Sequence, residues 1–451
     1  MILKIILGLI GLGIVVLIHE TGHFLAARFF GIGVEAFSIG MGPVLLHKKI
    51  GETEYRISLF PIGGYCKMSG ENDFKKSWEN FKNNIKEGKN TFLGASPGAR
   101  MAVAGAGPFF NIVFAVIVFA FIYGTGFEYP TMENRIVLVQ DVHSDAPSTP
   151  AQEAGLLTGD RIIKIGRKNV ENYRDIQIGI SINAKTNLPV TVERGDKTMV
   201  FNLKPALEKS TGAGKIGVYY WADPVIAEVE SGSASDRCGL KNGDRILKVN
   251  DEPIEYSVAL FKVLDAKPKE LNIEFLRGGE ILNTTLAISE DPNESFGFSW
   301  QGVHYKTPKY SLPGAIARGC EEAWMTLTTS VKSLGLLFGG VDLTQAVSGP
   351  VRITYMVGDV ATEGFKQSAG VAFRNIFNFL ALISIAVAVT NLLPLPILDG
   401  GLILIFFVEL LRRKPLNPLF IQVFQTAGIV LLAGLMVFGV FVDVKFLVKG
   451  G

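Results

Sequence analysis

The sequence predicts a polytopic α-helical membrane protein with four transmembrane helices, a membrane-associated β-hairpin or sheet, and two extracytoplasmic α+β domains. Three observations support this prediction. Charged residues make up only 19% of the 451 residues, and the mean hydropathy is +0.32. Uncharged stretches such as 101–127, 375–398 and 415–442 are long enough to cross a bilayer, which takes about 20 apolar residues. A motif at 154–165 recurs at 238–249. A wholly soluble protein is therefore excluded.

The first predicted span occupies residues 1–34. Its apolar run leads directly into His19-Glu20-Thr21-Gly22-His23, whereas a secretory signal peptide would end at a small-residue cleavage site. We therefore expect an uncleaved span. Residues 96–126, 372–411 and 412–451 are expected to contain the second, third and fourth spans.

Positive charges set the expected orientation. Residues 28–100 carry eleven Lys or Arg, and Arg412, Arg413 and Lys414 lie between the last two spans. Short loops rich in Lys and Arg stay in the cytoplasm. The block from 127 to 371 is then extracytoplasmic.

This block contains the repeat, with an offset of 84 residues. In each copy a Gly-Asp turn, Gly159-Asp160 or Gly243-Asp244, precedes alternating apolar positions, which is the pattern of a turn leading into a strand. We assign one small domain to 127–210 and another to 211–304. They resemble a tandem pair of PDZ domains, which bind peptides by strand addition.

Residues 305–371 follow the repeat. Between 311 and 340 the apolar residues have the spacing of a helix with one apolar face. This helix is expected either to lie on the membrane surface or to pack on the second repeat.

The chemistry is predicted in the first span, where His19-Glu20-Thr21-Gly22-His23 fits H-E-x-x-H. Positions i and i+4 share one helix face, so both imidazoles can bind one zinc ion. Glu20 is placed to act as the general base on a water that the metal activates. Ionisable residues are costly in lipid and mark a functional site.

A catalytic zinc takes three protein ligands and keeps one position open. His47 is a candidate by residue type, but it lies beside Lys48 and Lys49 in a charged connection. Asp399 is better, because Pro394 and Pro396 must break the third span just before it. Asn391 lies in an apolar run and needs a hydrogen-bond partner, which is either a polar group on another helix or a group of the substrate.

Taken together, these motifs are similar to those of the site-2 protease family of the RseP type, zinc intramembrane proteases with tandem PDZ domains. The resemblance rests on His19 to His23, Gly107-Pro108-Phe109-Phe110-Asn111, Asn391 to Gly400, Gly63-Gly64-Tyr65-Cys66-Lys67-Met68, the repeat and Ser348-Gly349-Pro350. It implies one Zn²⁺ held by His19, His23 and Asp399, Glu20 as base, and Asn391 as an active-site contact. Leu402 stands where relatives often carry His.

Residues 35–95 are expected to form a membrane-re-entrant β region followed by a cytoplasmic connection. The stretch 54–60 alternates like a strand. In relatives this region enters the membrane, and an edge strand there could hold an unwound substrate by main-chain hydrogen bonds. Tyr55, Arg56, Ile57, Ser58 and Leu59 are the expected substrate contacts. The alternative is a cytoplasmic hairpin without substrate contact.

The resemblance implies regulated intramembrane proteolysis in a bacterial inner membrane as part of an envelope stress response. Expected partners are the membrane and single-span substrates such as anti-sigma factors or remnant signal peptides, trimmed beforehand and filtered by the PDZ pair. A net charge of +2 gives no support for nucleic-acid binding, and the separated Cys66, Cys238 and Cys320 give none for a disulfide framework. We expect a monomer. The alternatives are a scaffold with structural zinc, or a tethered protease that acts on soluble proteins.

Overall fold

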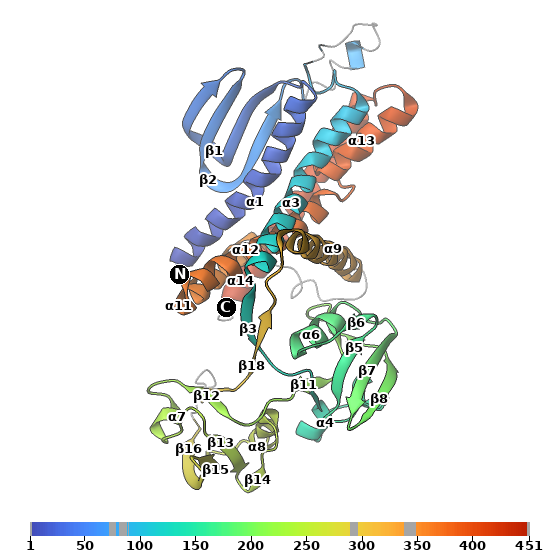
Figure 1. The fold of residues 1–451 in the computed structure, drawn as a ribbon. Helices are drawn as coiled ribbons and strands as arrows, with labels where there is room; N and C mark the ends of the chain where they lie inside the picture. The colour runs from blue at the N-terminus through green and yellow to red at the C-terminus, as the bar shows by residue number, and fades with distance from the viewer. Residues whose placement is uncertain are drawn as a thin grey trace. The chain divides into compact units, whose positions relative to one another are not determined.

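The computed structural model describes residues 2–71, 78–80, 88, 90–288, 296–337 and 349–448. These residues form two compact units. One unit contains the long apolar helices together with strands β1 and β2. The other contains the two repeats (Figure 1).

Four helices in the described part of the chain are long and apolar enough to cross a membrane. They are α1 (Ile2–Phe29), α3 (Pro97–Thr125), α12 (Ala369–Asn391) and α14 (Pro418–Val448). The prediction of four spans is thus confirmed. Local signals set their ends: Ser96 caps α3 by accepting from the Ala99 N–H at 3.3 Å, and α3 stops before Gly126, whose φ is 67°.

The predicted third region, 372–411, consists of two helices. Helix α12 ends at Asn391, and α13 (Asp399–Arg412) starts again after the two prolines. Ile397, with a φ of 78°, turns the chain between them. Asp399 therefore lies in the first turn of a new helix.

Strands β1 (Val34–Ile50) and β2 (Thr53–Met68) bend back on themselves and pair antiparallel along their length (Figure 1). Residues 36–39 pair with 64–67 on one side and with 54–57 on the other, while 46–49 pair with 54–57. The spatial order is therefore 64–68, 34–39, 54–58 and 44–50. The expectation that 54–60 forms an edge strand is wrong for 54–57, because both sides of that stretch already have neighbours.

Helix α9 (Leu312–Leu337) forms as expected, and part of it packs against the second span. Ala323 is buried, and together with Leu327 it lies in an apolar cluster with Phe119 of the second span. Trp324 is 67% exposed, so apolar side chains occur on two sides of this helix. Residues 338–340 of the predicted helix lie outside the described residues.

Helix α11 (Pro350–Gln367) was not predicted as a separate element. Its first main-chain N–H groups are bound by the buried Asp443 of α14, which accepts from Gly349 and from Val351, each at 2.9 Å. This explains Gly349 of the Ser348-Gly349-Pro350 motif, because a Cβ there would collide with the Asp443 carboxylate. Ser348 lies outside the described residues.

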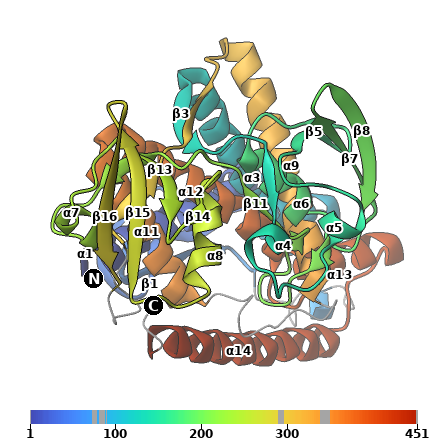
Figure 2. The same ribbon diagram turned by 90° about the horizontal axis from the view of Figure 1, so that it is seen from below.

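The second unit begins with β3 (Phe127–Thr131) and ends with β18 (Val303–Thr307), and these strands pair with each other. Between them the two repeats have the same arrangement. Each has a short pair formed by its first and last strands, and a four-stranded antiparallel sheet (Figures 1 and 2).

The elements of the first repeat are β4 (Ile136–Leu138), α4 (Val139–Val142), α5 (Pro150–Glu153), β5 (Arg161–Ile165), β6 (Lys168–Asn169), α6 (Tyr173–Ser181), β7 (Leu188–Arg194), β8 (Lys197–Leu203), β9 (Ala206–Leu207), β10 (Gly214–Lys215) and β11 (Val218–Tyr220). Strand β11 pairs with β4, and Ile216 belongs to the first core. The predicted boundary at 210 is therefore too early, because the first repeat closes on itself only at Tyr220.

The elements of the second repeat are β12 (Ile226–Val229), α7 (Ala234–Arg237), β13 (Arg245–Val249), β14 (Glu252–Pro253), a 3₁₀ turn (Ser257–Ala259), α8 (Leu260–Leu264), β15 (Glu270–Arg277), β16 (Glu280–Ala287) and β17 (Phe298–Trp300). In Figure 2 the strands β13 to β16 lie side by side. A separate core that includes Leu240, Ile246 and Phe275 holds this repeat together.

The repeated Gly-Asp turn has the same structural role in both copies. Asp160 is buried and accepts two hydrogen bonds from Arg194, at 2.7 and 2.8 Å. Asp244 is buried and accepts two from Arg277, at 2.7 and 2.6 Å. Bidentate carboxylate–guanidinium pairs are strong and geometrically specific. The motif therefore ties the turn to a neighbouring strand in each repeat.

Candidate metal centre

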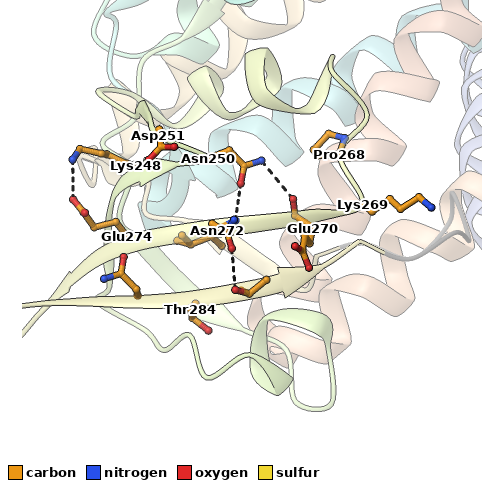
Figure 3. Close-up of a pocket in the computed structure, with 12 residues that line it drawn as sticks. Lys248, Asn250, Asp251, Pro268, Lys269, Glu270, Asn272, Glu274 and Thr284 are labelled. Carbon is orange, nitrogen blue, oxygen red and sulfur yellow. Dashed lines mark hydrogen bonds and ion pairs between the residues drawn. The ribbon is translucent and has the colours of Figure 1, made fainter.

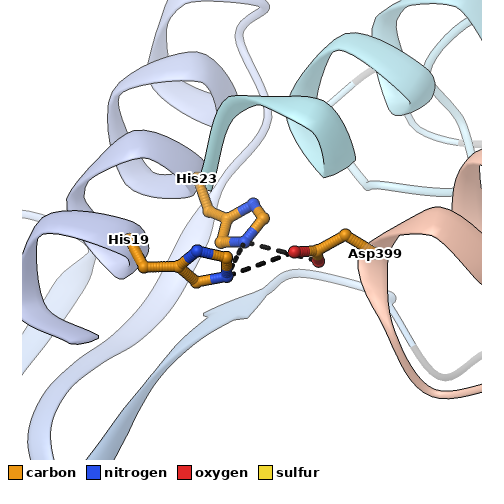
Figure 4. A group of neighbouring side chains, drawn as sticks. All are labelled: His19, His23 and Asp399. Atoms are coloured by element: carbon orange, nitrogen blue, oxygen red, sulfur yellow. Dashed lines mark hydrogen bonds and ion pairs between the residues drawn. The ribbon is translucent and has the colours of Figure 1, made fainter. Parts of the chain in front are cut away.

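Three side chains from two helices converge on one point (Figure 4). His19 and His23 lie one turn apart on α1, and Asp399 begins α13. His19 Nε2 lies 3.2 Å from His23 Nε2 and 3.1 Å from Asp399 Oδ2, and His23 Nε2 lies 3.5 Å from Asp399 Oδ1. Zinc ligands at about 2.0–2.1 Å in a tetrahedron lie about 3.3–3.4 Å apart. The three ligand atoms thus have the spacing that a zinc ion needs.

The environment of these atoms also suits a cation. Both histidines are buried, each 7% exposed. Asp399 Oδ2 is buried and accepts no hydrogen bond of good geometry from the described residues, despite its closeness to His19 Nε2. Two atoms that bind the same cation lie close together in this way without a hydrogen bond between them. The residues present therefore fit zinc, and three protein ligands leave the fourth position for water or substrate.

Helix α3 supplies the surface behind the histidines. His23 Nδ1 lies 2.8 Å from the carbonyl oxygen of Val103, and His19 Nδ1 lies 3.3 Å from Asn111 Nδ2. Between these contacts Gly107 faces the ligand atoms. A Cβ on Gly107 would lie 2.8 Å from His19 Nε2 and closer still to His23 Nε2. Glycine at this position leaves the space that the metal needs.

Glu20 lies beside the triad and contacts the sheet. The main chain of Cys66 hydrogen-bonds to Glu20, and the Glu20 carboxylate is within electrostatic reach of both histidines and Asp399. A Cβ on Gly64 would lie 3.4 Å from Glu20 Cγ. The stretch 64–68 of β2 therefore runs past the metal centre. Burial, with the nearby carboxylates of Glu20 and Glu71, raises the pKa of the Cys66 thiol.

Asn391 also reaches this centre. It is the last residue of α12, and its Nδ2 lies 3.4 Å from His19 Nε2. The helix end thus places an amide beside one of the three ligand atoms. The structure brings together His19, His23, Asp399, Glu20 and Asn391. His47, the rejected ligand candidate, instead pairs with Glu54 at 2.8 Å.

The expected substrate contacts at 55–59 have other partners in the structure. The Tyr55 ring lies edge-on to Phe24 of α1 and tilted against Phe37, so it packs the sheet on the first span. Arg56 pairs with Glu54 at 2.6 Å and donates to the Tyr65 hydroxyl at 2.9 Å.

Further along the same stretch, the Ser58 hydroxyl lies 3.0 Å from the Ser38 hydroxyl. Ile57 and Leu59 are half exposed. The stretch 55–58 is therefore interior sheet, and the edge that faces Glu20 is 64–68.

Sequence reasoning gave no role to Val103, Gly107 or Asn111. These residues are spaced four apart on α3, which places them on one helix face toward α1. The spacing from Gly107 to Asn111 was part of a recognised motif. That this face of α3 belongs to the metal centre is shown only by its contacts with His19 and His23, which are 80 to 92 positions away in the sequence.

A second concave surface lies on the sheet of the second repeat (Figure 3). Several of its polar groups bind one another. Asn250 Oδ1 accepts from the Asn272 N–H at 2.7 Å, Thr285 donates to Asn272 Oδ1 at 3.0 Å, and Lys248 lies 3.5 Å from Glu274. We attach no catalytic role to this hollow.

Comparison with known proteins agrees with the geometry of the metal centre. The profile of Peptidase family M50 matches residues 7–435. The "Putative zinc metalloprotease" of Treponema pallidum (strain Nichols) is 36% identical over 448 residues, covering 99% of both chains.

A protein of the same name from Borreliella burgdorferi is 31% identical over 460 residues, covering 99% of both chains. The regulator of sigma-E protease RseP of Escherichia coli (strain K12) is 28% identical over 471 residues, covering 96% of this chain and 97% of its own. The chain belongs to peptidase family M50, the site-2 proteases, and is a membrane-embedded zinc metalloprotease.

Proposed function

We propose that this protein cleaves a peptide bond within the transmembrane segment of a single-span membrane protein. The observation that carries the proposal is the position of the buried His19 and His23 and the partly buried Asp399 among helices apolar enough to span a membrane. A soluble substrate has no access to ligands at that position on a span. The open fourth position favours catalysis over the alternative of a structural zinc, which would have four protein ligands.

In this proposal each polar group has one task. Bound zinc supplies Lewis-acid polarisation and a water of lowered pKa. With zinc bound, Glu20 would take a proton from the attacking water and deliver it to the leaving amine. The Asn391 amide donates a hydrogen bond to the oxygen of the scissile carbonyl, where negative charge develops. His19, His23 and Asp399 hold the metal.

The edge stretch 64–68 is the better candidate for holding the substrate. A transmembrane helix has its main-chain groups internally paired, so the scissile bond becomes accessible only when the helix unwinds locally. No strand among the described residues pairs with the outer side of 64–68, and this stretch passes Glu20. An unwound segment added there would lie beside the base.

The substrates expected from the sequence are anti-sigma-factor-like proteins or remnant signal peptides, in a bacterial inner membrane. The charge pattern favours a cytoplasmic position for the metal and an extracytoplasmic position for the repeats. We propose that the two PDZ-like repeats act as a size filter, which admits substrates whose outer domain has already been removed. The RseP relative, named as a regulator of sigma-E protease, supports this class of substrate.

The variant Glu20→Gln tests the chemistry. The amide keeps the shape of Glu20 but cannot take a proton, so cleavage should fall by about 10²–10⁴-fold or more. Zinc should stay at one equivalent, because Glu20 is no ligand. Cleavage of a single-span reporter in detergent and the zinc content of the same preparation are the two measurements. If cleavage persists at the wild-type rate, Glu20 is not the base.

A further inference from the structure

Each histidine that binds zinc through Nε2 has a second ring nitrogen to satisfy. In the neutral ring that binds a metal through Nε2, the Nδ1 atom carries a hydrogen and needs an acceptor. For His23 this acceptor is the carbonyl oxygen of Val103, at 2.8 Å. That contact selects the form of His23 whose Nε2 lone pair faces the metal centre.

For His19 the group opposite Nδ1 is the side-chain amide of Asn111. His19 Nε2 faces His23 and Asp399, so His19 Nδ1 is the atom that must carry the hydrogen. As placed, the Asn111 Nδ2 group lies 3.3 Å from it, which sets N–H against N–H in the zinc-binding form. In the same side chain Oδ1 is buried and accepts no hydrogen bond from the described residues.

A half-turn of the amide removes this conflict. The oxygen and nitrogen of an asparagine amide exchange places with almost no change in shape. Oδ1 then accepts the hydrogen of His19 Nδ1, and Nε2 keeps its lone pair for zinc. Asn111 is 0% exposed and His19 is 7% exposed, so bulk solvent does not reach this contact.

We infer that Asn111 is a positioning residue that accepts the Nδ1 hydrogen of His19 and holds this ring in its zinc-binding form. Helix α3 then supplies one acceptor to each histidine, the Val103 carbonyl and the Asn111 amide, with Gly107 between them. The Ser384 hydroxyl of α12 donates to the main-chain carbonyl of Asn111 at 3.1 Å and makes no contact with the side-chain amide. The inference rests on the proposed function only in taking the triad as a zinc site.

The test compares Asn111→Asp and Asn111→Leu, which have nearly the same shape. Aspartate keeps the acceptor, and leucine removes it. Loss of a hydrogen-bond partner behind a zinc ligand typically weakens metal affinity by about 10–100-fold. We expect that loss for Asn111→Leu and an affinity within about threefold of wild type for Asn111→Asp. Ser384→Ala removes the neighbouring hydrogen bond without touching the amide, and should leave zinc affinity unchanged.

The readout is zinc affinity of the full chain in detergent, by competition with a chelator, without substrate. Circular dichroism of each variant shows whether the helices remain. Equal loss in the Asp and Leu variants would overturn the inference, because the amide would then act as a donor or only fill space. Wild-type affinity in the Leu variant would overturn it too. If wild type itself bound no zinc, the proposed function would fall instead.

Discussion

Gly107 determines, at the scale of single residues, whether a metal can enter the centre. It faces both histidine Nε2 atoms, and a side chain at this position would fill the space that zinc needs. For Gly105, two residues earlier on the same helix, the one atom among the described residues that lies near its Cβ position is Ile403 Cδ1, at 3.8 Å. Gly105 can therefore serve as the control position for a substitution at Gly107.

We predict that Gly107→Ala weakens zinc binding and Gly105→Ala does not. The added methyl at 107 meets two ligand rings, and an overpacked site costs about 1–3 kcal/mol, or roughly 5–150-fold in affinity. At 105 the methyl makes an ordinary contact. Zinc content after dialysis against a chelator measures both variants. If both variants retained the same amount of zinc, the histidine rings would have moved aside, and glycine at position 107 would not be required for zinc binding.

Much of the metal centre could be predicted at the residue scale. The spacing of His19 and His23 follows from the helical repeat, and Asp399 from the prolines before it, so both signals are local in sequence. The role of Asn111 depends on a contact with His19 across 92 positions, and nothing in the local pattern of α3 shows it. Local periodicity predicts on which face of a helix a residue lies, but it does not predict which distant residue that face contacts.

Helix α13 carries Asp399, and a buried ion pair fastens this helix to α3. Arg100 Nη1 lies 2.8 Å from Glu409 Oε2, with both side chains more than 90% buried. The Arg100 guanidinium lies over the Phe406 ring at 4.6 Å, and Glu409 Oε1 accepts from the Leu416 N–H at 2.9 Å. The pair thus helps to hold the element that delivers the third ligand.

We predict that Glu409→Gln destabilises the protein more than the double variant Arg100→Met with Glu409→Gln. Glutamine can still accept from Leu416, but it leaves the buried guanidinium uncompensated, which typically costs about 3–5 kcal/mol. Removing both charges removes most of that cost. Thermal unfolding in detergent compares the two. Equal unfolding temperatures would show that the charge pair contributes nothing beyond packing.

The elements themselves were only partly predictable. The long apolar runs determine the spans, so α3 begins and ends where expected. The bends of β1 and β2 depend on pairing between segments far apart, so the interior position of 54–57 did not follow from its alternation. Helix α11 also escaped prediction, because its start depends on Asp443, a residue 94 positions from Gly349.

The whole molecule combines a metal centre among apolar helices with a separate two-repeat unit. The chain enters the second unit through β3 and leaves it through β18, and these strands pair, so the repeats form one insertion between α3 and α9. The charge pattern and the 84-residue offset predicted this insertion. The exact boundary between the repeats could not be predicted from the sequence, because the first repeat is completed by the pairing of β4 with β11, which are far apart in the sequence.

The measurement that tests the central claim most directly is cleavage of a single-span reporter helix by the full chain in detergent, with and without a bulky outer domain. Wild type, Glu20→Gln and Asp399→Asn are compared. We predict that wild type alone cuts the trimmed reporter within its apolar segment, and that the bulky domain slows cleavage. Equal cutting of both reporters would remove the size filter and leave the protease. Cutting by wild type and both variants alike, or no cutting by wild type with one equivalent of zinc bound, would contradict the account.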